Sequence, residues 1–185
     1  MTQKFSKLSK PEKCWVYLHL FKAKKAFKIS MEAEKTADSI QKTRLLDQDK
    51  NGGQVDAFRH AYWMYTLAKK IGKRAAKSLG EAHEKGNYQQ FKNAKLENGA
   101  VADEASSKMD LANNEKALEL YKEHKKISKT EIIKLLISEI KKGNFKILNK
   151  NNLGDYLDCN NYTIPKNELE KTWKNNKCLI PSKLW

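Results

Sequence analysis

Polar side chains that could do chemistry occur in three short segments, at positions where a helical pattern expects apolar residues. Asp56 and His60 stand four positions apart, so a helix would place them one above the other on the same face. His83, Glu84 and Asp110 follow in two later segments. Burial of a neutral polar group without a partner costs about 2–7 kcal/mol, and burial of a charge costs more. We therefore expect the three segments to meet.

Two imidazoles and at least two carboxylates form a ligand set for a divalent metal ion. We predict that His60, His83 and Asp110 are the ligands, and that the ion is zinc or manganese in preference to calcium. A water molecule bound to such an ion could become a nucleophile near neutral pH. Glu84 or Asp56 would then act as the general base. These residues therefore predict a metal-dependent hydrolase.

Further polar residues beside these positions are expected to hold the substrate: Arg59, Asn113 and Asn114. Guanidinium and carboxamide groups can donate hydrogen bonds to an oxyanion. Two metal-free interpretations use the same side chains. In the first, a carboxylate orients His60 as a base, which resembles the histidine of secreted phospholipases, although Ala61 stands where those enzymes carry aspartate. In the second, the residues form a buried structural network in a non-enzymatic binding or interaction module.

The chain is strongly basic. Its 185 residues include 37 lysine and arginine residues and 22 acidic residues, which give a formal net charge of +15 at pH 7. Such a charge favours an anionic partner, for example a phospholipid, a nucleic acid or another phosphorylated substrate. Direct nucleic-acid binding by lysine-rich helices is therefore a further interpretation of the function. Because the lysines are spread along the chain, a soluble basic surface without a specific partner would have the same composition.

The cysteines and the N-terminal residues indicate a soluble protein. Cys14, Cys159 and Cys178 are far apart and form no Cys-x-x-Cys pair, so we expect reduced thiols. The first residues lack the pattern of a secretory signal peptide. No segment approaches the roughly 20 apolar residues that span a bilayer. We therefore expect neither a signal peptide nor a transmembrane segment.

Helical periodicity dominates the chain, and segments with the period of a strand are nearly absent. The predicted helices cover about residues 11–28, 30–46, 54–71, 75–83, 102–126 and 130–142. The fold class is therefore all-α. We expect one helical domain over residues 1–185 with about six helices and an irregular C-terminal tail over residues 146–185, which contacts the body through Trp173, Leu179 and Trp185.

Two connections between these helices have sequences that could serve a function. Residues 47–53 resemble the start of an EF-hand calcium loop, with oxygen-bearing side chains at alternate positions and glycine at the sixth. The twelfth position is Phe58 in place of glutamate, so a plain loop is the preferred interpretation. Residues 85–100 have weak periodicity and two glycines. They could cover a site or form a surface connection.

The three polar segments together resemble a known family. They read Asp56-Ala-Phe-Arg-His-Ala-Tyr-Trp63, Ala82-His-Glu84 and Lys108-Met-Asp-Leu-Ala-Asn-Asn114. This is similar to a bacterial domain of unknown function with the motifs DAFRHAYW, AHE and MDLHNN. The resemblance covers about residues 45–145, which leaves residues 1–44 as additional N-terminal helices. This chain departs from the pattern at Ala112, where the family often has histidine.

The resemblance implies a biological setting more than it implies a reaction. That family occurs alone or at the C-terminal end of large polymorphic-toxin and wall-associated proteins. It implies an effector or toxin module, located in the bacterial cytoplasm or delivered by a dedicated secretion system, with an immunity protein as partner in the case of a toxin. Combined with the polar residues and the basic charge, the expected function is a metal-dependent hydrolase that acts on an anionic phosphodiester or phospholipid.

Overall fold

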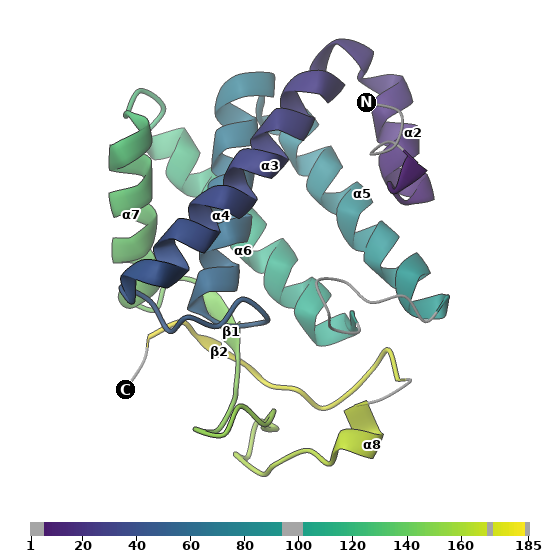
Figure 1. The fold of residues 1–185 in the computed structure, drawn as a ribbon, viewed down its shortest axis with the longest axis vertical. Helices are drawn as coiled ribbons and strands as arrows, with labels where there is room; N and C mark the ends of the chain where they lie inside the picture. The colour runs from purple at the N-terminus through teal and green to yellow at the C-terminus, as the bar shows by residue number, and fades with distance from the viewer. Residues whose placement is uncertain (1–5, 94–101, 170–171, 184–185) are drawn as a thin grey trace.

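The protein is described by a computed structural model over residues 6–93, 102–169 and 172–183 (Figure 1). Its helices are α2 (Lys10–Leu18), α3 (Leu20–Thr43), α4 (Gln54–Ile71), α5 (Lys73–Lys92), α6 (Glu104–Glu123), α7 (Lys129–Lys141) and the short α8 (Lys166–Leu169). Two short strands are β1 (Lys146–Leu148) and β2 (Leu179–Pro181). The predicted all-α fold is confirmed. Within the described ranges, every helix is too short or too polar to cross a bilayer.

Helix α4 is the centre of the fold and contacts α3, α5, α6 and α7. Figure 1 shows α3 crossing α4, with α7 on one side and α5 on the other. The side chains of α4 are buried in nearly every direction, as its apolar composition predicts. Phe58 and Tyr62 stack with ring centroids 5.9 Å apart, and Tyr65 meets Tyr121 of α6 edge to face at 5.5 Å. The polar residues Asp56 and His60 of α4 therefore lie within the core, whereas Lys70 at its C-terminal end is exposed.

The first two helices differ from the prediction. The sequence predicts a helix over residues 11–28 and a second one capped by Ser30, but the chain breaks at His19. The backbone there is non-helical, with φ −132° and ψ 42°. The His19 ring stacks on Trp15 at 4.4 Å and its Nδ1 lies 3.0 Å from the Trp15 carbonyl oxygen. Such a local contact of a side chain with the backbone competes with the helical hydrogen bonds. The helix therefore breaks here although neither glycine nor proline is present. Ser30 lies inside α3 and donates to the Ala26 carbonyl.

Helix α5 is longer than the prediction. It continues to Lys92, so residues 85–92 of the expected cover or surface connection are helical. Glu84, Gly86 and Asn87 are buried on this part of the helix. Residues 94–100 of that connection lie outside the described residues.

The C-terminal segment returns to the helical body through the small sheet. Strands β1 and β2 are antiparallel, with Ile147 opposite Ile180. Trp173 packs on α5, with ring centroids 4.8 Å from Tyr88 and 5.4 Å from Phe91. The expected contact of the tail through Trp173 is confirmed, whereas Trp185 lies outside the described residues.

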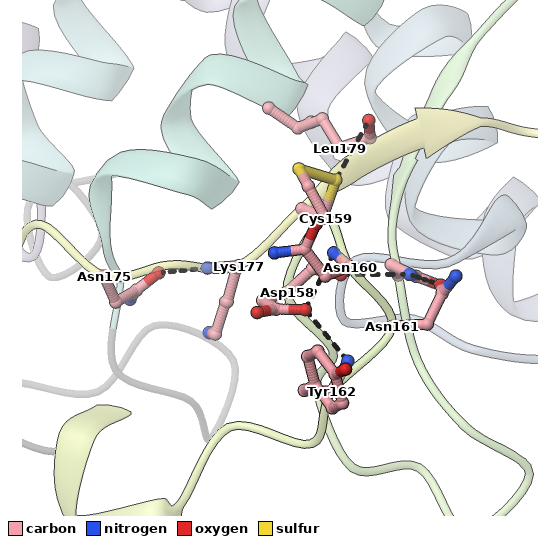
Figure 2. The surroundings of a disulfide bond; sticks show 10 residues. Asp158, Cys159, Asn160, Asn161, Tyr162, Asn175, Lys177 and Leu179 are labelled. Atoms are coloured by element: carbon pink, nitrogen blue, oxygen red, sulfur yellow. Dashed lines mark hydrogen bonds between the residues drawn. A yellow bond between two sulfur atoms is a disulfide. The ribbon is translucent and has the colours of Figure 1, made fainter.

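A disulfide joins Cys159 to Cys178 (Figure 2), so the expectation of reduced thiols is wrong for this pair. The backbone explains how residues 19 positions apart meet. The Asn149 N–H donates to the Cys178 carbonyl at 2.8 Å, and the Cys178 N–H donates to the Leu157 carbonyl at 3.1 Å. These bonds hold the residue before β2 beside Asn149 and Leu157 of the C-terminal segment. Cys14 is a free, exposed thiol.

A candidate metal centre beside a cleft

Three buried side chains from α4 and α6 form a candidate metal centre: Asp56, His60 and Asp110. His60 Nε2 lies 3.6 Å from Asp56 Oδ1 and 3.4 Å from Asp110 Oδ1. One potential ligand atom from each residue lies within 4.8 Å of the others. Two carboxylates and one imidazole at this spacing could hold a metal ion. Two of the three predicted ligands, His60 and Asp110, therefore converge as expected.

The loop before α4 fixes the position of Asp56. The Gly52 N–H donates to Asp56 Oδ2 at 2.7 Å, and the carboxylate lies in the first turn of α4, where the helix dipole favours negative charge. Gly52 has φ +92°, and a Cβ there would lie 2.6 Å from Leu148 Cδ1. Only glycine fits both the backbone conformation and the contact with β1.

Arg59 supplies a cation to this centre. Its Nη2 lies 2.7 Å from Asp56 Oδ1 and 3.0 Å from His60 Nε2. Its Nη1 lies 3.7 Å from Glu34 Oε2 on α3. Because a guanidinium only donates hydrogen bonds, His60 Nε2 must accept, which puts the proton of a neutral imidazole on Nδ1. The guanidinium therefore lies among the atoms that would otherwise bind an ion.

The environment keeps His60 neutral. Burial lowers its pKa well below the usual 6.5, and the positive charges of Arg59 and His83 lower it further. Its Nδ1 is buried and has no hydrogen-bond partner among the described residues. A neutral, buried imidazole with an unused nitrogen is typical of a functional site more than of a completed core.

His83, the third predicted ligand, lies beside the centre and outside the candidate ligand set. Its Nδ1 is 3.0 Å from Glu12 Oε1 on α2, and its ring centroid is 6.3 Å from that of His60. Burial alone would raise the pKa of Glu12, but the hydrogen bond and charge of His83 and the hydrogen bonds from Ser9 together lower it. The structure thus reveals a carboxylate–histidine pair that the sequence did not suggest.

The other residues predicted for the site occupy different places. Glu84 is buried, and its Oε2 accepts from Asn87 Nδ2 at 3.2 Å. Asn113 exchanges two hydrogen bonds with the backbone of Lys146, at 2.9 and 2.8 Å, and so joins α6 to β1. Asn114 is buried against Gly80, where a Cβ would lie 3.2 Å from its Nδ2. The roles predicted for Glu84, Asn113 and Asn114 stay predictions.

The centre borders a cleft of about 770 Å³ between α2, α3, α4 and α5. Its apolar walls include Trp15, Val16, Phe27, Trp63 and Leu79. Its polar lining includes Glu12, Glu34, Arg59, His60 and His83. Both histidines therefore face one cleft, and the mixture of apolar walls with a few polar groups is typical of a ligand site.

The loop over residues 47–53 is held by its own acidic side chains. Asp47 accepts from the backbone N–H groups of Gln54 at 2.6 Å and Asp49 at 2.9 Å. Asp49 Oδ2 pairs with Lys150 Nζ at 2.5 Å. These carboxylates organise the start of α4, which agrees with the preferred interpretation of a plain loop.

Comparison with known proteins identifies a family. No curated protein and no solved structure matches the chain. Residues 13–144 match the family described as a domain of unknown function, DUF6973, and this match includes α4, α5 and α6 with Asp56, His60 and Asp110. Glu12 stands one residue before the match begins. Because the match covers more than half of the sequence, the chain belongs to the DUF6973 family.

Proposed function

We propose that the protein is a metal-dependent hydrolase that cleaves an anionic phosphodiester or phospholipid. The observation that carries this proposal is the buried group of Asp56, His60 and Asp110, of which His60 lines a cleft of about 770 Å³. The net charge of +15 favours an anionic substrate. The family resemblance adds the proposal that the chain serves as a bacterial effector or toxin module, with an immunity protein as its partner.

The donor set fits a divalent ion. Asp56 and Asp110 supply two carboxylates, and His60 is neutral, as metal ligation requires. An imidazole ligand favours zinc or manganese over calcium. Such an ion, when bound, would act as a Lewis acid and lower the pKa of a water molecule. Asp56, His60 and Asp110 would hold the ion in the place where the Arg59 guanidinium now pairs with Asp56, and the guanidinium would then be available to bind the anionic group of the substrate.

His83 and Glu12 are the proposed acid–base pair of the cleft. Glu12 Oε1 accepts a hydrogen bond from His83 Nδ1, so the other ring nitrogen, Nε2, can exchange a proton with a bound substrate. Both residues line the cleft, whereas Glu84 is absent from its described lining. We therefore assign the base to His83, with Glu12 as the residue that orients it, in place of the earlier candidates Glu84 and Asp56.

A metal titration tests the proposal. After treatment with a chelator, Zn²⁺ or Mn²⁺ should raise the melting temperature of the wild-type protein, and His60→Gln should abolish the rise. Hydrolysis of bis(p-nitrophenyl) phosphate should fall by about 10²–10⁴-fold in the same variant. His124→Gln is a matched control, because its side chain is 44% exposed and belongs neither to the candidate ligand set nor to the described lining of the cleft. Wild-type protein that neither binds an ion nor loses activity with chelator would contradict the proposal.

A non-enzymatic role is the second candidate, and the position of Arg59 favours it. The 2.7 Å contact with Asp56 and the 3.0 Å contact with His60 give the centre a cation of its own. In this case the polar group is a structural network of a binding module. His60→Gln should then lower the melting temperature of the chelator-treated protein, and no ion should change that temperature.

A further inference from the structure

The corner between α2 and α3 exposes large apolar side chains. Leu18 is 76% exposed, Leu20 is 65% exposed and Phe21 is fully exposed. Tyr17 beside them is 66% exposed. Single exposed apolar residues are common on protein surfaces, but a contiguous group marks an interaction surface. We call residues 17–28 the apolar corner.

The apolar corner is also strongly basic. Between Glu12 and Glu32 the chain has five lysines and no acidic residue. Four of these lysines lie in the first turns of α3 and are exposed: Lys22, Lys24, Lys25 and Lys28. Apolar side chains flanked by several lysines are the pattern of a segment that lies in the interface of an anionic bilayer, where the apolar groups enter the acyl boundary and the lysines meet headgroups.

The charge argues against other occupants of this surface. Two copies of the chain would bring the same lysines together, which repel each other. A nucleic acid would pair with the lysines but would leave Leu18, Leu20 and Phe21 in water. An anionic phospholipid surface satisfies both the lysines and the apolar side chains.

The apolar corner adjoins the cleft. Val16 on α2 and Ala23 and Phe27 on α3 line the cleft and come from the same turns of helix as the exposed side chains. Figure 1 shows the corner at one end of the molecule, at the top of the view, and the C-terminal segment at the other end. A protein bound through this corner would therefore hold the cleft close to the lipid.

We propose that the apolar corner docks the protein on an anionic phospholipid membrane and that a phospholipid is the substrate of the cleft. The second part rests on the proposed hydrolase function, whereas docking depends only on the surface. The wild-type chain should sediment with vesicles that contain phosphatidylglycerol and stay in solution with vesicles of phosphatidylcholine alone. High salt should weaken the binding.

Paired substitutions test the surface. Leu18→Ser with Phe21→Ser should reduce binding to the anionic vesicles by at least about tenfold. The matched control is Leu153→Ser with Tyr162→Ser, which removes side chains that are 87% and 72% exposed in the C-terminal segment. For charge, Lys24→Gln with Lys25→Gln should weaken binding more than Lys125→Gln with Lys126→Gln, another exposed pair.

A spectroscopic variant guards against loss of the fold. Phe21→Trp keeps an aromatic side chain at a fully exposed position, and its emission should shift to the blue when anionic vesicles are added. Docking is overturned if wild-type protein does not sediment with anionic vesicles, or if the Ser pair binds as tightly as the control pair.

The same vesicles separate docking from chemistry. His60→Gln should sediment like the wild-type protein while lipid hydrolysis is lost. Wild-type protein that docks and cleaves bis(p-nitrophenyl) phosphate, but leaves the vesicle phospholipid intact, overturns phospholipid as the substrate. Docking without chelator-sensitive cleavage of either compound overturns the proposed hydrolase, and with it phospholipid as the substrate, while membrane docking stands.

Discussion

Helix α6 carries two buried polar clusters that differ in how completely their hydrogen bonds are formed. At its start, Asp103 Oδ1 accepts from the Ser106 N–H at 2.8 Å, and Oδ2 accepts from Asn175 at 2.9 Å and Lys177 at 2.5 Å. Two turns later, Asp110 lies 3.4 Å from His60 Nε2, and His60 Nδ1 has no partner among the described residues. One cluster is complete and the other is not.

The difference separates a structural joint from a candidate site. A buried polar group without a partner costs about 1–3 kcal/mol, so a fold rarely keeps one without a reason. The Asp103 cluster fastens the C-terminal segment to α6 and leaves nothing for a ligand. The His60 cluster borders the cleft and has a nitrogen to spare. A ligand with a hydrogen-bond acceptor would complete the bonding of the Nδ1–H, whereas Nε2 is the ring nitrogen near the two carboxylates.

The largest predicted effect comes from a substitution that breaks the fully hydrogen-bonded Asp103 cluster. Asp103→Ala should lower the free energy of unfolding by about 3–5 kcal/mol, because it strands Lys177, whose side chain is only 7% exposed. Urea unfolding measures the change. The neighbouring Glu104→Ala is the control: it removes a pair with Lys108 whose side chains are 62% and 32% exposed, and should cost about 1 kcal/mol or less. Equal losses of stability in the two variants would contradict the conclusion that the Asp103 cluster is a structural joint.

The pH dependence of the free energy of unfolding tests the incomplete His60 cluster. Below pH 6.5 the unfolded chain takes up a proton at this residue, whereas the folded protein does not, because burial lowers the folded pKa. The free energy of unfolding should therefore fall with decreasing pH below 6.5, by about 1.4 kcal/mol per pH unit more in the wild type than in His60→Gln. Urea unfolding with chelator present measures both slopes. Parallel slopes would show that His60 gains a proton in the folded protein.

The smallest predicted effect concerns Arg59. If the guanidinium occupies the place of an ion, Arg59→Met should raise the affinity for Zn²⁺ about tenfold, equivalent to about 1.4 kcal/mol. Isothermal titration calorimetry measures the affinity. Arg74→Met, at an exposed position of α5, is the matched control and should leave it unchanged. Weaker binding by Arg59→Met would mean that the arginine supports the ion and does not compete with it.

The sequence predicted the helical fold and the meeting of the segments that carry Asp56, His60, His83 and Asp110, because both follow from periodicity. It named His83 as a ligand, whereas the candidate ligand set has Asp56 in that place. Polar residues at inward positions of separate helices must share a partner. Asn113 has the same signature but bonds to the backbone of Lys146. A polar residue on an inward helical face therefore predicts burial beside a hydrogen-bond partner. The sequence does not show whether that partner is the backbone of a strand or a substrate.

Other features depend on contacts between distant residues. Glu12 meets His83 across 71 positions, and in the sequence it only completes the capping box of α2 with Ser9. The break at His19 needs no glycine or proline. The pairing of Cys159 with Cys178 depends on the backbone hydrogen bonds of Cys178 with Asn149 and Leu157, which lie beyond the ends of two three-residue strands and leave no pattern in the sequence.

The disulfide acts as a tether for the Asp103 cluster. Asn175 and Lys177 lie just before Cys178, so the cross-link to Cys159 limits the volume that both side chains can search (Figure 2). In an oxidising compartment the effective concentration of Asn175 and Lys177 at Asp103 stays high. A reductant opens the cross-link, so a longer flexible segment connects these residues to the body and their effective concentration falls. Redox conditions would thus act first on the start of α6, two turns before Asp110, whereas the cleft is lined by residues of α2 to α5.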